Sequence, residues 1–130
     1  MIVLDSSAVL EVLLRSSVGL EIEERIFSFQ ETLFAPHLLD LEVAQVLRRY
    51  CASGEITSER GKDAIEDLKD FPIYRYEHDI FLHRVWELRP NMTAYDAVYI
   101  ALAETLSAPL LTRDAHLASA PGHAAVIELI

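Results

Sequence analysis

The sequence alternates short apolar runs with longer helical segments from one end to the other. Short runs rich in Ile, Val, Leu and Phe, bounded by Pro, Ser or Asp, are typical of buried strands. We expect five strands, at residues 2–4, 32–35, 72–76, 109–112 and 126–129. Strands that alternate with helices usually pair in parallel, so the pattern predicts an α/β fold with a mostly parallel sheet covered on both faces.

Helical periodicity fills the stretches between these runs. Ser6 and Ser7 are placed to cap the first helix and Thr93 to cap the last, while Gly54 is placed to end the third. The expected helices cover residues 8–14, 18–29, 37–52, 57–70, 77–88 and 94–106. We therefore expect a single domain over residues 1–130, a length that suits one ordinary folding unit.

Composition excludes several classes of protein. The chain has 21 acidic and 11 basic residues, a net charge of −10, which argues against a general nucleic-acid coat protein with a broad basic face. A hydrophobic fraction of 52% excludes a disordered chain, and the single Cys51 excludes an intramolecular disulfide or a Cys-rich zinc site. No apolar stretch approaches the roughly 18 residues of a membrane span, and no signal peptide is evident, so we expect a cytoplasmic protein.

Four acidic residues have unusually apolar surroundings. Asp5 directly follows the first predicted strand, and Asp114 lies two residues beyond the fourth. Glu42 and Asp96 lie in predicted helices whose residues at spacing three and four are mainly apolar or small. Because ligand sites in open α/β sheets gather at the carboxyl ends of the strands, we expect these acids to converge there.

Each acid also has a purely structural interpretation. Asp96 could complement the helix dipole, Asp5 could accept hydrogen bonds from backbone N–H groups, Asp114 could start a turn, and Glu42 could pair with an arginine. Together, however, four carboxylates repel one another unless protons or a cation neutralise them. Mg²⁺ or Mn²⁺ bound by oxygen ligands would do so, and such ions suit phosphodiester hydrolysis.

These same residues carry a family resemblance that covers essentially the whole chain. The sequence resembles the PIN-domain ribonucleases and, within them, the VapC toxins of toxin–antitoxin modules, in residues 2–8, 42–49, 95–104 and 110–118. The resemblance implies a three-layer α/β/α fold with a five-stranded sheet. It also implies Mg²⁺-dependent endonucleolytic cleavage of RNA (Mn²⁺ being an alternative ion) that leaves 5′-phosphate and 3′-hydroxyl ends.

The resemblance assigns roles to individual residues. The acidic quartet of the family matches the catalytic and metal-binding candidates Asp5, Glu42, Asp96 and Asp114.

Further positions match polar residues around that quartet. Ser6 stands where the family usually has Thr or Ser, and the Thr112 hydroxyl could orient Asp114. Arg113 and His116 could contact a substrate phosphate, or be a solvated arginine and a turn histidine. Gln45 stands where the family often has Asn. Gln carries the same amide group on a longer side chain.

The resemblance also implies partners. Such toxins bind an RNA substrate, usually form homodimers and are silenced by a cognate VapB-like antitoxin. The apolar residues of the second and third predicted helices could dock this antitoxin or could belong to the core; they are Leu20, Ile26, Phe27, Leu38 and Leu39.

Three other interpretations compete with a nuclease. A haloacid-dehalogenase-like phosphatase needs a second Asp two residues after the first, where this chain has Ser7. A phospho-receiver domain needs a lysine at a strand end, and the two lysines, Lys62 and Lys69, lie in a predicted helix. A catalytically silent PIN-like module that binds protein is the remaining alternative, although all four acidic positions are intact.

Overall fold

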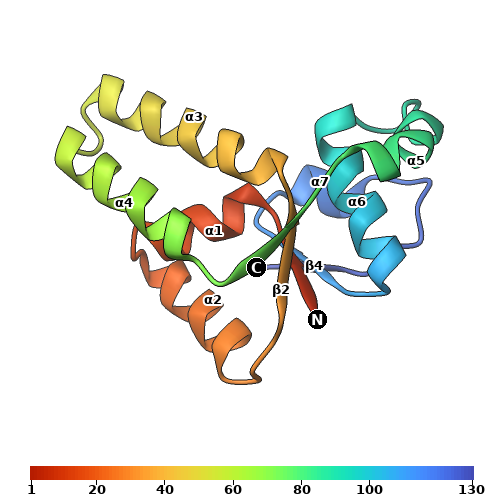
Figure 1. Ribbon diagram of the computed structural model, residues 1–130, viewed down its shortest axis with the longest axis horizontal. Helices are drawn as coiled ribbons and strands as arrows, with labels where there is room; N and C mark the ends of the chain where they lie inside the picture. The colour runs from red at the N-terminus through yellow and green to blue at the C-terminus, as the bar shows by residue number, and fades with distance from the viewer.

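The sheet has five strands, and all of them run in the same direction. The computed structural model describes residues 1–130. The strands are β1 (Ile2–Leu4), β2 (Leu33–Pro36), β3 (Ile73–Tyr76), β4 (Leu110–Thr112) and β5 (Ile127–Leu129), in the spatial order β3-β2-β1-β4-β5 (Figure 1). Every neighbouring pair is parallel, with Val3 of β1 opposite Phe34 on one side and Leu110 on the other.

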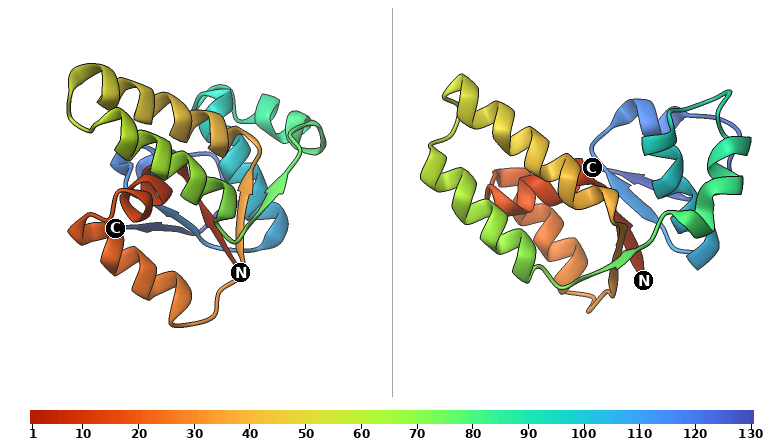
Figure 2. Two further views of the ribbon diagram at one scale, coloured as in Figure 1. Left: turned by 60° about the vertical axis from the view of Figure 1, so that its left-hand side comes forward. Right: turned by 45° about the horizontal axis from the view of Figure 1, so that its top comes forward.

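Helices cover both faces of this sheet. One layer comprises α1 (Ser6–Leu13), α2 (Ser17–Phe27), α3 (Leu38–Ser53) and α4 (Ser58–Asp70). The other holds the 3₁₀ turn η1 (Asp79–Phe81), α5 (Leu82–Glu87) and α6 (Ala94–Leu106), while the short α7 (Ala115–Ser119) packs near β4 and β5. The right-hand view of Figure 2 shows these two layers on opposite sides of the sheet. The expected three-layer α/β/α fold is thus confirmed.

The core is centred on β1 and α6. All three residues of β1 are fully buried, as expected for the central strand of a sheet covered on both faces. Residues 97–103 of α6 are also buried without interruption, because this helix lies between the sheet and α5. A helix that is apolar on every side is a core helix, and α6 holds one end of the site described below.

Most boundaries differ from the sequence prediction by one or two residues, and three differences have a clear structural cause or change an element. The first helix begins at Ser6 rather than residue 8, because Asp5 itself caps it by accepting a hydrogen bond from the Ala8 amide at 3.2 Å. A 3₁₀ turn and the short α5 replace the single helix predicted at 77–88. Helix α7 was not predicted, and it begins where the Asp114 carboxylate caps the chain.

The apolar residues considered for antitoxin docking divide into two groups. Ile26 and Leu39 are fully buried core residues, so they provide no docking surface. Leu20 and Phe27 are exposed on α2, and Leu38 is partly buried. Separately, none of the helices is long and apolar enough to cross a membrane.

Candidate acidic site at the carboxyl edge of the sheet

The candidate site lies where the strand order reverses. The chain proceeds outward from β1 to β2 and β3, and then returns to place β4 on the opposite side of β1. Asp5 follows β1, and Asp114 follows β4 after one intervening residue. Because all strands end at the same edge, the two acids flank the switch point at which α/β proteins bind ligands.

Asp5 is almost completely buried and is held by three donors. Its side chain accepts hydrogen bonds from the Ser7 hydroxyl at 2.6 Å, the Thr112 hydroxyl at 2.5 Å and the Ala8 amide. Burial nevertheless raises the pKa of Asp5 above its ordinary value, since the three donors, which lower the pKa, do not cancel the loss of water. The nearby negative charge of Asp114 raises this pKa further. The carboxylate is therefore fixed in place and poorly compensated in charge.

Thr112 connects Asp5 with Asp114. Its hydroxyl, which is fully buried, donates to Asp5 and accepts a hydrogen bond from the Asp114 amide at 2.9 Å. The Asp114 carboxylate accepts hydrogen bonds from the amides of His116 and Leu117, which fixes the start of α7. Thr112 therefore orients Asp5 directly, and it fixes the backbone of Asp114 rather than the carboxylate.

Glu42 enters the site from α3 and is held by a buried tyrosine. The Tyr99 hydroxyl on α6 donates to the Glu42 carboxylate at 2.6 Å, and the Ser6 hydroxyl also lowers the pKa of Glu42. Partial burial outweighs both donors, so the pKa of Glu42 is raised, with smaller contributions from the charges of Asp5 and Asp96. The pKa of Tyr99 is raised by its own burial and then by Glu42, which keeps the phenol a neutral donor.

Asp96 completes the cluster from the first turn of α6. Its side chain is partly buried, and burial raises its pKa first, followed by the charges of Asp114 and Asp5. His116 acts in the opposite direction and lowers the pKa of Asp96. The structure thus brings the four predicted acids close enough to repel one another, although they come from four separate parts of the chain.

The cluster has the donor chemistry of a hard divalent cation but does not form a closed cage. All its ligand atoms are carboxylate or hydroxyl oxygens, the type that Mg²⁺ and Mn²⁺ prefer. No three His, Cys, Asp or Glu side chains converge closely enough to enclose one ion. The residues therefore fit an ion of the Mg²⁺ type, which usually binds through one or two carboxylates and keeps several waters.

The two predicted phosphate contacts lie at the rim. Arg113 donates its backbone amide to the Ser7 hydroxyl, and its guanidinium faces Glu11 at 3.6 Å. His116 is exposed, and its imidazole is near enough to Asp96 to influence that carboxyl. A phosphate contact by Arg113 would have to replace its ion pair with Glu11.

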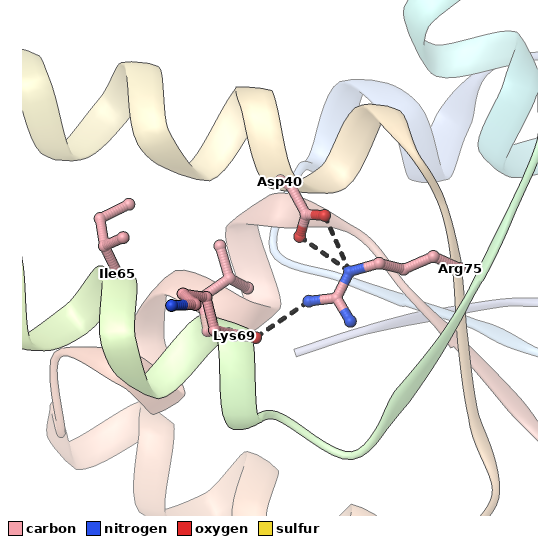
Figure 3. A pocket seen from close by; sticks show the side chains of 5 residues that line it. Asp40, Ile65, Lys69 and Arg75 are labelled. Atoms are coloured by element: carbon pink, nitrogen blue, oxygen red, sulfur yellow. Dashed lines mark hydrogen bonds and ion pairs between the residues drawn. The ribbon is translucent and has the colours of Figure 1, made fainter.

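A separate hollow of about 480 Å³ lies away from the acids, between α4, β3 and the start of α3. Figure 3 shows that Arg75 fills its polar end. The Arg75 guanidinium donates to Asp40 at 2.8 Å and to the backbone carbonyl of Leu68 at 2.9 Å. Because Arg75, Asp40 and the Leu68 carbonyl satisfy one another, Arg75 anchors α3, the helix that carries Glu42.

Two residues of the site were not predicted from the sequence. Ser7 donates to Asp5, a role that the sequence prediction divided between helix capping and Ser6. Tyr99 holds Glu42 across 57 positions of the chain. The available signal for Tyr99 was its position one helical turn after Asp96, which places the two residues on the same side of α6.

Comparisons with known proteins show which family the chain belongs to. The PIN-domain family matches residues 2–122. "Ribonuclease VapC1" of Mycobacterium tuberculosis is 46% identical over 97 residues, which cover 74% of this chain and 73% of the relative. "Ribonuclease VapC12" of the same species is 36% identical over 130 residues, 100% of this chain and 99% of the relative.

A solved structure shows the same fold. The crystal structure of PAE2754 from Pyrobaculum aerophilum superposes with a TM-score of 0.69 and covers 97% of this chain and 81% of that one, at 21% identity. The fold, the family match over nearly the whole chain and the full-length relative lead to one conclusion. The chain belongs to the PIN-domain family and, within it, to the VapC ribonucleases.

Proposed function

We propose that this chain is a metal-dependent endoribonuclease that acts as the toxin of a toxin–antitoxin pair. The observation that carries the proposal is the convergence of Asp5, Glu42, Asp96 and Asp114 at the switch point of a chain that matches VapC ribonucleases along its length. Helix capping explains the positions of Asp5 and Asp114, but it does not explain why four mutually repelling carboxylates gather, three of them (Asp5, Glu42 and Asp96) at least partly buried. They suit a protein that binds a cation and acts on a phosphodiester.

The proposed cation is Mg²⁺, with Mn²⁺ as a substitute, held by the four acids directly or through water. When bound, such an ion supplies charge neutralisation at phosphate oxygens and makes a water more acidic. The chain's own residues hold two of the carboxylates in place and oppose the effect of burial on their ionisation: Ser7 and Thr112 donate to Asp5, and Tyr99 donates to Glu42. Attack of water on phosphorus, with departure of the 3′-oxygen, leaves 5′-phosphate and 3′-hydroxyl ends.

The proposed inhibitor is a VapB-like antitoxin. An acidic cluster in a chain of net charge −10 attracts a basic peptide segment, and a basic side chain near Asp96 would relieve the repulsion among the acids. Exposed Leu20 and Phe27 on α2 remain available to the apolar part of such a segment. A homodimer of this single domain is part of the same proposal, as expected for a VapC-type toxin.

The decisive experiment incubates antitoxin-free protein with total RNA, with and without Mg²⁺, and maps the cut ends. We expect cleavage by the wild type only with the ion, and loss of cleavage in Asp96→Asn. Asp63→Asn is the matched control, because Asp63 is exposed on α4, outside the site. A catalytically silent module predicts no cleavage by the wild type, and equal cleavage by Asp96→Asn would also refute the proposal.

A thermal-shift measurement gives an independent test of the ion. Mn²⁺ should raise the melting temperature of the wild type and of Asp63→Asn, because an ion that binds only the folded state stabilises it. The rise should shrink in Asp96→Asn. Equal rises in all three proteins would place the ion elsewhere.

A further inference from the structure

A hollow of about 390 Å³ lies beside the acidic site, between α3 and the start of α6. Ser6 and Glu42 line it, so the hollow opens directly onto the acids, and Gln45, Arg49 and Tyr95 form its polar and aromatic part. Its volume falls within the range of roughly 300–1,000 Å³ that is typical of small-ligand sites. The polar ends of Gln45, Arg49 and Tyr95 make no hydrogen bond or ion pair within the protein.

The residues on its α3 side follow helical spacing. Glu42, Gln45 and Arg49 are separated by three and four positions and therefore lie in a row on one face of α3. Gln45 and Arg49 are exposed, and Arg49 takes part in none of the salt bridges of the chain. The row along α3 therefore begins with a carboxylate at the acidic site, continues with an amide and ends with a free guanidinium.

The α6 side offers an aromatic surface. Tyr95 immediately precedes Asp96, and it is 63% exposed, although neighbouring residues of α6 are buried. It has no aromatic partner within the protein, whereas Tyr74, which is equally exposed, stacks on Phe34. The exposed ring of Tyr95 therefore lies at the junction between the hollow and the acids.

We propose that this hollow binds the nucleotide adjacent to the scissile phosphate of a single-stranded RNA. The base stacks on Tyr95, the Gln45 amide reads its edge with one donor and one acceptor, and Arg49 binds the next phosphate. Gln45 and Tyr95 thus determine specificity. The inference rests on the proposed function, because it places in the hollow the nucleotide next to a phosphate that is bound at the acids.

Continuity with the acids favours RNA over a protein as the occupant. A chain with a phosphate at Glu42 and Asp96 has the hollow directly beside it, because Glu42 belongs to both. The one cation of the hollow is also notable in a protein of net charge −10. It provides a local attraction for phosphate where the overall field repels RNA.

The first test measures binding of a fluorescein-labelled, mixed-sequence, single-stranded RNA to the full chain by anisotropy, in EDTA and low salt. Loss of one stacking platform should make Tyr95→Ala bind roughly 5- to 150-fold more weakly, while Tyr95→Phe stays near the wild type. Tyr74→Ala is the matched control, since Tyr74 is 64% exposed but lies on β3 away from the site. Arg49→Gln should reduce the slope of log K against log salt by about 0.7, the value for one single-strand phosphate.

The second test sequences the ends that the Mg²⁺-activated protein leaves on a random RNA library. Gln45→Ala should change the preferred base beside the cut. The inference is overturned if Tyr95→Ala and Tyr74→Ala bind RNA equally and Gln45→Ala keeps the wild-type base preference. It is also overturned if sedimentation shows that Tyr95→Ala breaks a wild-type dimer, since a second copy then occupies the hollow.

These outcomes are distinct from failure of the proposed function. Anisotropy in EDTA requires no cleavage, so it tests the hollow even in a protein that cuts nothing. If the wild type leaves RNA intact with either metal, the nuclease proposal fails, whatever Tyr95 binds. If the wild type cuts and all substitutions in the hollow are silent, only the nucleotide site fails.

Discussion

Replacing Thr112 with valine should destabilise the protein in a way that depends on the charge of Asp5. The substitution keeps the branched shape of the side chain and removes its hydroxyl. That hydroxyl is fully buried, donates to Asp5 at 2.5 Å and accepts from the Asp114 amide at 2.9 Å. The variant therefore removes one donor from a buried carboxylate and one acceptor from a backbone amide.

The expected loss follows from these two bonds. A hydrogen bond to a charged group contributes about 1.5–3 kcal/mol and a neutral one about 1 kcal/mol. Water screens little of the first, because Asp5 is only 6% exposed, whereas the Asp114 amide can recover a water partner near the surface. We expect the free energy of unfolding of Thr112→Val to fall by about 2–4 kcal/mol at pH 7.5.

The pH dependence separates this explanation from simple loss of packing. The Thr112 bond lowers the pKa of Asp5, so its charge-assisted part is present when Asp5 is ionised and is lost as the pH falls through the pKa of that carboxyl. Burial raises this pKa above its ordinary value of 3.8, so part of Asp5 is protonated at pH 4. The loss of stability in Thr112→Val should then shrink towards about 1 kcal/mol, the contribution of a hydrogen bond between uncharged groups. Urea unfolding at both pH values measures the difference.

Two further variants complete the test. Thr112→Ser keeps the hydroxyl and should lose only the contribution of one methyl group, about 1 kcal/mol at either pH. In an Asp5→Asn background, Thr112→Val should cost less than in the wild type, because no charge remains to be stabilised. An equal cost at both pH values and in both backgrounds would refute the reasoning.

Three other predictions concern stability. Asp5→Asn should raise the melting temperature at neutral pH, because the raised pKa of Asp5 means that wild-type stability falls as the pH rises through that pKa. The gain should vanish in acid, which calorimetry at several pH values would show. Arg75→Gln should lower the free energy of unfolding by about 1–2 kcal/mol after allowance for the 41% exposure of Asp40, with a double-mutant cycle isolating the pair. Gly19→Ala should lower the free energy of unfolding by about 1–3 kcal/mol or prevent folding, because the added Cβ would overlap the Glu11 carbonyl where α1 contacts α2. An unchanged midpoint in urea unfolding would show instead that α2 can move away.

Periodicity alone sufficed to predict the sheet and the main helices. Helix α4 begins directly after Thr57 because the Thr57 side chain caps it, and α6 begins directly after Thr93 for the same reason. The central strand was evident from its three apolar residues. The segment at 77–88 was mistaken for one helix because apolar spacing does not distinguish a 3₁₀ turn followed by a short helix from a continuous α-helix.

The contacts between side chains were beyond the reach of sequence patterns. Neither the donation of Ser7 to Asp5 nor that of Tyr99 to Glu42 follows from spacing, since each depends on rotamers and on packing between distant elements. The same applies to α7, whose five residues are too few for periodicity. It begins because the Asp114 carboxylate accepts two backbone amides, an event that the sequence analysis could describe only as a turn.

The structural and functional interpretations of the acids turn out to be compatible. Asp5 caps α1, Asp114 caps α7 and Asp96 lies in the first turn of α6, so three of the four acids occupy helix N-termini. Backbone amides and helix dipoles stabilise negative charge at such positions without placing a competing cation beside it. The fold can therefore hold carboxylates close together while leaving oxygen atoms free for an ion.

Glu42 is the exception, and it shows what that arrangement requires. It lies within α3, beyond the first turn, so no helix N-terminus compensates its charge, and burial raises its pKa. The neutral, fully buried Tyr99 hydroxyl replaces the missing backbone donor. Asp5, Glu42 and Asp114 thus accept hydrogen bonds from amides or hydroxyls, and Asp96 lies at a helix N-terminus. None of the four acids forms a salt bridge, so no side-chain cation competes with a metal ion for their charge.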